Sequence, residues 1–251
     1  MTQVPREAGV LDAVVSLVDS LLDDFDVVEL LTQLTEHCAS LLDIASAGLL
    51  LADPSGELHL MAATSGRTRE LELFQLQTDE GPCLDCYASG RPVSVSDLQS
   101  AAQRWPRFVR AATDAGFASV HAVPMRAART VLGALGLFGT QVGELTAADL
   151  LVGQTLAHIA CVAIMQEQAP APEVVLPRLH RALTCRVEVE QAKGFLRERL
   201  RVSVEDAFHL LRRYARTHDE HLTVVSRRLV NQPDSRPAIL EAMSRIATRR
   251  S

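Results

Sequence analysis

Three cations lie at helical spacing around residue 190. Lys193 and Arg197 follow Arg186 by 7 and 11 residues. At 100° per residue, those offsets return to within about 20° of the starting direction on an α-helix. Glu190 shares this face, and Lys193 is the only lysine of the chain. Fixed positive charges in such a row can contact the phosphates of a polyanion. The simpler interpretation of any lone lysine is a solvated side chain on a helix.

The same segment carries two apolar seams. We expect the first to pack inside the protein's own helical bundle, and it consists of Val189, Ala192, Leu196 and Leu200. The second advances in steps of 7, 4 and 7 residues, close to coiled-coil spacing, along Leu176, Leu183, Val187 and Gly194. A helix with two seams can bury one and offer the other to a second copy. We therefore predict a parallel homodimer whose seam includes Leu176, Leu183 and Val187.

A pair of cysteines, Cys83 and Cys86, follows a proline in a loop-like stretch. This spacing is compatible with metal binding or redox chemistry. A zinc site needs about four ligands, and no second C-x-x-C or H-x-x-x-H stands nearby. We therefore favour a packed pair in a sensor loop and predict no metal. His121 and His158 are expected to be core or pocket-lining residues.

No motif for catalysis accompanies these residues. The chain lacks a nucleophile elbow, a phosphate-binding P-loop and an acidic dyad with supporting context. We therefore do not expect an enzyme. The acidic run at Asp23, Asp24 and Asp26 is most simply a solvated helix end.

The formal net charge of −6 is the sum of an acidic N-terminal part and a basic C-terminal part. Residues 178–251 hold 16 Arg plus Lys against 9 Asp plus Glu, whereas residues 1–177 hold 9 against 22. An acidic part is thus followed by a basic part suited to a polyanionic partner. The sequence has no run of 18 apolar residues, and its start lacks the profile of a signal peptide. We expect a cytoplasmic protein without membrane contact.

Periodicity predicts the order of elements in residues 10–168. Two amphipathic helices come first, followed by a hairpin over 47–65, helical segments, a strand over 92–98, a helix over 105–115, strands over 119–125 and 130–140, and a helix from Ala147. Gly133 and Gly136 suit close packing in a central strand. Thr146 and Asp149 form a capping box for the last helix. This order describes an α+β sandwich around one antiparallel sheet.

Residues 10–168 resemble a GAF domain of the actinobacterial type. The resemblance rests on the order of elements and on the phrases GPCLDCYASGRPVSVSDL, VPMRAARTVLGALGLFGT and ELTAADLLVGQTLAHIA. It implies a sensor domain with a pocket for a small molecule or another signal, and it places Cys83 and Cys86 in the sensor loop. Signatures for cyclic nucleotide, haem or bilin are not evident. We therefore assign no cofactor, and the signal, small-molecule or redox, is unknown.

A proline-rich linker over 169–176 leads to a second, all-α domain over 177–232. Ser203 and Asp206 form a capping-box analogue at the start of its next helix, and a third helix spans 222–230. Residues 233–251 are expected to be a basic tail with a possible short helix.

The second domain resembles an ANTAR domain, the RNA-binding module of bacterial transcription antiterminators. The resemblance rests on RVEVEQAKGFLRERL, SVEDAFHLLRRYA and LTVVSRRLV. It implies a dimeric three-helix bundle that binds paired RNA hairpins in nascent transcripts. The residues placed at the RNA are Arg186, Gln191, Ala192, Lys193, Gly194, Arg197 and Arg212. Arg186, Lys193 and Arg197 are expected on phosphates or loop bases, and Gln191 on a base edge. Glu188 and Ser226 depart from the family pattern.

Three hypotheses follow for the function. The leading one is a transcription antitermination regulator in which a GAF sensor controls RNA binding by a dimeric ANTAR domain. The second is a redox or metal sensor acting through Cys83 and Cys86, which alkylation or metal content would distinguish. The third is a DNA-binding regulator, since a basic three-helix bundle could enter a major groove. Competition between hairpin RNA and duplex DNA would separate it from the first.

Overall fold

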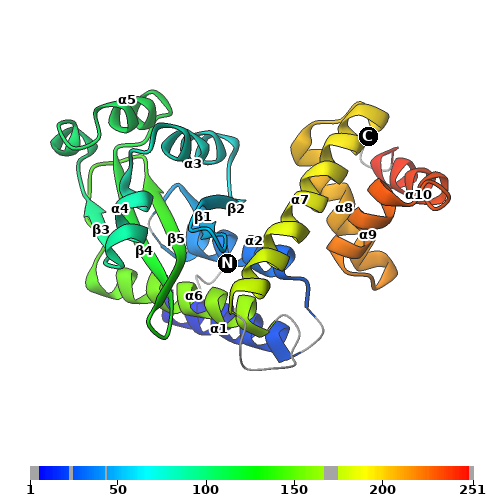
Figure 1. Cartoon of the computed structure of the whole chain (residues 1–251), viewed down its shortest axis with the longest axis horizontal. Coiled ribbons are helices and arrows are strands. Elements are labelled where there is room, and N and C mark those ends of the chain that lie inside the picture. The colour runs from blue at the N-terminus through cyan, green and yellow to red at the C-terminus, as the bar shows by residue number, and fades with distance from the viewer. Residues whose placement is uncertain (1–5, 23–24, 43, 167–174, 249–251) are drawn as a thin grey trace. The chain divides into compact units, whose positions relative to one another are not determined.

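The computed structural model describes residues 6–22, 25–42, 44–166 and 175–248, drawn in Figure 1. The chain divides into two compact units. The first unit comprises Met1–Asp24 and Leu30–His180. The second unit comprises Phe25–Glu29 and Arg181–Ser251. Residues 169–174 of the predicted linker lie outside the described residues, and its last two residues, Val175 and Leu176, already belong to a helix.

The first unit is built on a five-stranded sheet. Its strands are β1 (Ser46–Ala52), β2 (Leu58–Ala63), β3 (Val93–Val95), β4 (Ser119–Ala127) and β5 (Thr130–Gly139). They lie in the order β2-β1-β5-β4-β3, and every neighbouring pair is antiparallel. β5 is the central strand, since Gly133 pairs with Leu51 on one side and Met125 on the other. The predicted antiparallel sheet flanked by helices is confirmed.

Helices cover both faces of this sheet (Figure 1). On one side lie α1 (Arg6–Leu22) and α6 (Ala147–Gln166), which pack on each other, and α6 also packs on β4. On the other side lie α3 (Gly66–Thr78), α4 (Pro82–Ser89) and α5 (Pro106–Asp114), and a short 3-10 turn, η1 (Leu98–Ala101), precedes α5. The sheet side chains alternate accordingly. Leu137 and Val123 approach α6 at Gly153, whereas Phe138 packs with Trp105 and Phe108.

Polar caps fix where the long helices begin. The predicted capping box at α6 is confirmed, because Asp149 N donates to Thr146 Oγ1 and Thr146 N donates to Asp149 Oδ2. By length and composition α6 could cross a membrane, but half of its apolar window is buried in the protein. Its packing on β4 and α1 is that of a core helix.

The first predicted amphipathic helix is α1. The fully buried positions are Ala13 and Leu17. A line of apolar side chains on the same helix is exposed, with solvent-exposed fractions of 65% for Leu11, 56% for Val15, 40% for Val18 and 79% for Leu22. An exposed apolar line on one helix is a surface that a partner can cover.

The second unit is a helical bundle. Its helices are α7 (Val175–Leu200), α8 (Val204–His218), α9 (Leu222–Asn231) and α10 (Arg236–Thr248), and the N-terminal turn of α2 (Val27–Leu41) belongs to the same unit. The predicted inner seam of α7 is confirmed at Val189, Ala192 and Leu196, which are fully buried, whereas Leu200 at the end of the helix is half-buried. Ser203 caps α8 by accepting a hydrogen bond from Asp206 N. Ser226, a departure from the family pattern, is buried and donates to Leu222 O.

The bundle extends beyond three helices. α10 lies in the region predicted as a tail, and it packs on α8 and α9 with Ile239 and Met243 buried. Arg236 joins it to α9 by donating to the carbonyl oxygens of Leu229 and Val230. A cation at that position also opposes the negative end of the α9 dipole.

Candidate functional sites

A chain of ion pairs organises the cationic face of α7. The Glu190 carboxylate lies 2.6 Å from Arg186 Nη2 and 3.0 Å from Lys193 Nζ. The exposed fractions of Arg186 and Lys193 are only 8% and 6%. The two cations therefore share a face, as predicted, and the alternative interpretation of Lys193 as a solvated side chain is wrong. Their burial is tolerated because each cation pairs with the Glu190 carboxylate.

Phe208 of α8 brings two of the predicted RNA-binding residues together. Lys193 Nζ lies 5.2 Å from the centre of its ring, and the Arg212 guanidinium carbon lies 5.6 Å from it. Both distances are within the range of a cation–π contact. Residues that are 19 positions apart thus form one cationic cluster around an aromatic ring.

The other predicted RNA-binding residues divide between surface and core. Gln191, Gly194 and Arg197 are exposed on α7, and a Cβ added at Gly194 would meet no atom within 4 Å. This open line is available to a large ligand. Ala192, in contrast, is fully buried in the bundle, so its position on the inner seam makes it a packing residue and not a surface contact.

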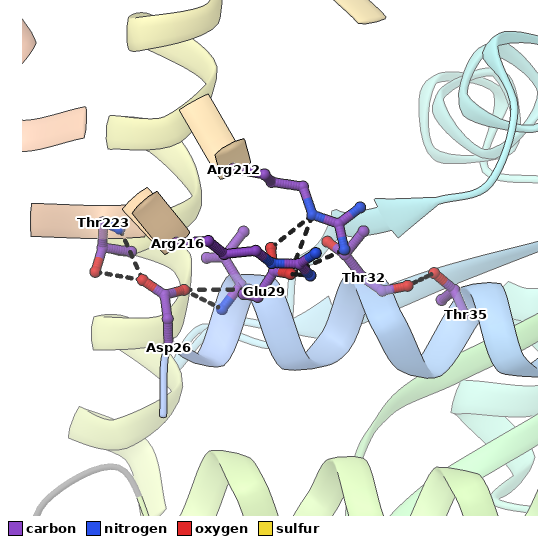
Figure 2. A network of polar contacts seen from close by, with 8 residues as sticks. Asp26, Glu29, Thr32, Thr35, Arg212, Arg216 and Thr223 are labelled. Carbon is purple, nitrogen blue, oxygen red and sulfur yellow. Dashed lines mark hydrogen bonds and ion pairs between the residues drawn. The ribbon is translucent and has the colours of Figure 1, made fainter. Parts of the chain in front are cut away.

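Two carboxylates near the start of α2 meet the arginines of α8 and the first turn of α9 (Figure 2). Glu29 Oε1 accepts hydrogen bonds from Arg212 Nε at 3.0 Å, Arg212 Nη2 at 2.8 Å and Arg216 Nη2 at 2.6 Å. Asp26 Oδ2 accepts from the backbone N and the hydroxyl of Thr223, each at 2.7 Å. We call the segment Phe25–Glu29 the acidic arm. The interpretation of Asp26 as a solvated helix end is wrong, and Asp23 and Asp24 lie outside the described residues.

The dimer seam is described only in part. Val187 is 54% exposed on α7, as a contact with a second copy requires. The backbones of Leu176 and Leu183 are helical, but their side chains lie outside the described residues. Glu188, beside Val187, pairs with Arg227 of α9 at 2.8 Å, which accounts for a carboxylate between two valines.

A second cluster is buried in the first unit between α3, α4 and the sheet. Gln75 Nε2 donates to Glu72 Oε2 at 2.5 Å, Cys83 N donates to Gln75 Oε1 at 3.1 Å, and Cys83 Sγ lies 3.7 Å from Glu72 Oε1. Glu72, Gln75, Cys83 and Cys86 are all fully buried. Glycines make the room, because a Cβ on either Gly48 or Gly136 would lie 2.6 Å from Glu72 Oε1.

Burial keeps this cluster protonated at neutral pH. It raises the pKa of Glu72 to about 8 and that of Cys86 to about 12, and it also raises the pKa of Cys83. Both cysteines are therefore thiols at neutral pH. The thiolate, which is the form that attacks substrates and binds metals, is disfavoured at both positions. Within the described ranges, no group of three or more His, Cys, Asp or Glu side chains could hold a metal ion.

One of the expected helical segments is α3, but its polar face was not expected to be the buried one. Thr68, Glu72 and Gln75 face inward, and Thr68 Oγ1 extends a hydroxyl network with Ser46, Thr64 and Ser65. A signal was available, since these residues recur at spacings of 4 and 3. These buried polar groups thus find their hydrogen-bond partners inside the unit.

The two predicted core histidines differ in environment. His121 is 2% exposed, and burial lowers its pKa, so it is neutral at pH 7. His158 is exposed on α6, where its Nε2 lies 3.2 Å from Gln154 Nε2. The prediction is therefore confirmed for His121 and wrong for His158.

Comparison with family models finds two domains in this chain. Residues 26–165 match the GAF domain model, and residues 178–230 match the ANTAR domain model. The second match covers the helices that carry the Phe208 cluster. Comparison with curated protein sequences gives no match.

Solved structures resemble the first unit in fold. The GAF domain of the Acinetobacter phosphoenolpyruvate-protein phosphotransferase is 16% identical with a TM-score of 0.51, and the match covers 65% of this chain and 97% of that one. The corresponding domain from Coxiella burnetii is 15% identical with a TM-score of 0.52, over 63% of this chain and 94% of that one.

One similar structure is an enzyme. The free methionine-R-sulfoxide reductase of Neisseria meningitidis, solved with its substrate, is 16% identical with a TM-score of 0.51, over 72% of this chain and 96% of that one. At such identities the likeness concerns the fold alone. It shows that this fold occurs in both regulators and enzymes.

Proposed function

Because the chain belongs to the GAF domain family and continues into an ANTAR domain, we propose that it is a signal-responsive antitermination regulator. In this proposal the ANTAR domain of a homodimer binds paired RNA hairpins in nascent transcripts. The GAF domain receives a small-molecule or redox signal and changes the affinity for RNA. The protein acts in the cytoplasm, where nascent bacterial transcripts are found, and neither domain needs a catalytic role.

The observation that carries the proposal is the arrangement of cations on the ANTAR helices. Lys193 and Arg212 flank Phe208, and Gln191 and Arg197 stand exposed on the same helix as Lys193. Sequence-specific RNA-binding proteins combine cations for phosphates with amide groups and planar groups for splayed loop bases. For Arg186 or Lys193 to contact RNA, that cation would have to exchange its ion pair with Glu190 for an ion pair with a phosphate.

Replacing Lys193 with alanine is the direct test of this RNA site. We expect the affinity for paired-hairpin leaders to fall by about tenfold, as the loss of a cation contact costs on the order of 1 kcal/mol or more. RNA crosslinked to the full-length protein, followed by sequencing and filter binding, measures this. Arg245→Ala is the matched control, because Arg245 is 71% exposed on α10 and removing it changes the net charge equally.

Two results would contradict the proposal. If Lys193→Ala recovered the same leaders with unchanged affinity, Lys193 would not belong to the RNA site. If hairpin RNA and duplex DNA of matched charge bound equally at moderate salt, RNA-specific recognition would be wrong. Thermal unfolding of each variant separates lost binding from lost structure, since Lys193 is buried.

The exposed line on α1 supports a homodimer. Leu11, Val15, Val18 and Leu22 advance in steps of 4, 3 and 4 residues, which is the spacing of a coiled-coil seam. A two-fold interface places the same surface of each copy against the other. An apolar line of this spacing is therefore suited to the same helix of a second copy, in addition to the predicted seam at Val187.

We expect the double variant Val15→Glu/Leu22→Glu to raise the dimer dissociation constant by at least about tenfold, because carboxylates would be buried in the seam. Sedimentation equilibrium of the full-length protein measures this. Leu73→Glu is the control, since Leu73 is an exposed apolar residue on α3 of the same unit. A dimer that survives the double variant but not Val187→Glu would assign the contact to α7 alone.

A further inference from the structure

The acidic arm and the α8 arginines form a built anion site. Arg212 and Arg216 lie one turn apart on α8, and both donate to the single carboxylate of Glu29 (Figure 2). The Arg212 side chain is 12% exposed and that of Glu29 is 18% exposed, whereas Arg216 is 63% exposed. One arginine is thus fixed in place while the other remains accessible from solvent.

The groups that hold the arm are the groups that proteins use for phosphate. A guanidinium donates two parallel hydrogen bonds to carboxylate and phosphate oxygens alike. The backbone N and hydroxyl of Thr223, in the first turn of α9, hold Asp26 in the manner of a helix N-terminus with an anion. The two carboxylates therefore mark two positions that fit phosphate oxygens.

We propose that Arg212, Arg216 and Thr223 form a phosphate-binding part of the RNA surface, and that Glu29 and Asp26 of the acidic arm occupy it in the absence of RNA. This inference rests on the proposed RNA-binding function and adds a regulatory element to it. RNA binding at this site requires the arm to leave. Its carboxylates accept the hydrogen bonds of Arg212, Arg216 and Thr223, and they also repel the incoming phosphates.

The position of Arg212 connects this site to the cluster described above. Arg212 and Lys193 contact the same Phe208 ring, so a strand whose phosphate reaches Arg212 passes beside Lys193. The ion pair of Arg216 with Glu29 is partly exposed to solvent and contributes modestly to stability. The pair of Arg212 with Glu29 is largely buried, so Arg212 needs another anion when the arm leaves. The arm is therefore displaceable by a polyanion that offers several phosphates at once.

Glu29→Gln in the full-length protein tests the proposal. The substitution removes the negative charge from the arginines with little change of shape, and we expect hairpin RNA to bind about fivefold tighter, the factor equivalent to about 1 kcal/mol. Glu198→Gln is the matched control, because Glu198 is an exposed carboxylate on α7 and the net charge changes equally. An affinity gain no larger than that of Glu198→Gln would overturn the proposal.

A probe other than RNA separates this inference from the proposed function. Inorganic tripolyphosphate, titrated by calorimetry, should bind Glu29→Gln at least about threefold tighter than the wild type, and Arg212→Ala in the Glu29→Gln background should abolish the gain. If tripolyphosphate binding followed that pattern but hairpin RNA bound neither the wild type nor any variant, the anion site would be supported and the proposed RNA function would be wrong. If RNA bound the wild type and tripolyphosphate binding ignored Glu29 and Arg212, the inference would be wrong and the function would stand.

Discussion

Replacing Gly133 with alanine should destabilise the first unit by at least about 3 kcal/mol. We call this unit the GAF unit, because it contains most of the residues that match the GAF domain model. A Cβ at Gly133 would lie 2.0 Å from the backbone oxygen of Leu50 and 3.0 Å from Leu51 Cα. These atoms belong to the neighbouring strand β1, so no side-chain rotation can relieve the overlap. β5 would have to move away from β1, with loss of hydrogen bonds at the centre of the sheet.

Urea unfolding followed through Trp105 measures this effect, since Trp105 is the only tryptophan and is buried in the same unit. Gly143→Ala is the matched control, because a Cβ there would meet no atom within 4 Å. We expect its free energy of unfolding to stay within about 0.5 kcal/mol of the wild type. A Gly133→Ala protein as stable as Gly143→Ala would show that the two central strands separate easily.

Local patterns in the sequence were sufficient for most of the fold. The strand glycines at 133 and 136, the capping box at Thr146 and Asp149, and the apolar seam through Val189 each predicted the observed element, because each depends on residues within a turn or two. For α10 we expected only a possible short helix in a basic tail, although Ile239, Leu240, Met243 and Ile246 recur at helical spacing. Its stability comes from packing on α8 and α9, which periodicity cannot reveal.

The site could be predicted only in outline. Helical spacing placed Arg186, Glu190 and Lys193 on one face, but it could not show that this face is buried. The partners that decide accessibility come from distant positions, since Phe208 lies on α8 and Glu29 is 183 residues before Arg212. A lone carboxylate in the apolar run from Val27 to Leu31 was the available signal.

The buried Glu72 should make the stability of the GAF unit depend on pH. Its pKa is about 8 in the folded protein against an ordinary value of 4.5, so between those values the folded state holds a proton that the unfolded state has released. The free energy of unfolding must then fall as the pH rises from about 4.5 to about 8. The total change attributable to Glu72 is on the order of 4 kcal/mol.

Glu72→Gln should remove that dependence, because an amide keeps the shape and the contact with Gln75 but does not ionise. Near pH 5 the variant and the wild type should unfold at similar urea concentrations, and at pH 8 the variant should be more stable by a few kcal/mol. Trp105 fluorescence at the two pH values measures this, with Glu70→Gln as the control on the exposed side of α3. Equal pH slopes for all three proteins would mean that Glu72 ionises freely when folded.

A ligand that binds beside α3 with a positive group would shift the same equilibrium, because it would favour the charged carboxylate. The pH slope of the wild type, measured with and without a cationic compound, is therefore also an assay for the unknown signal.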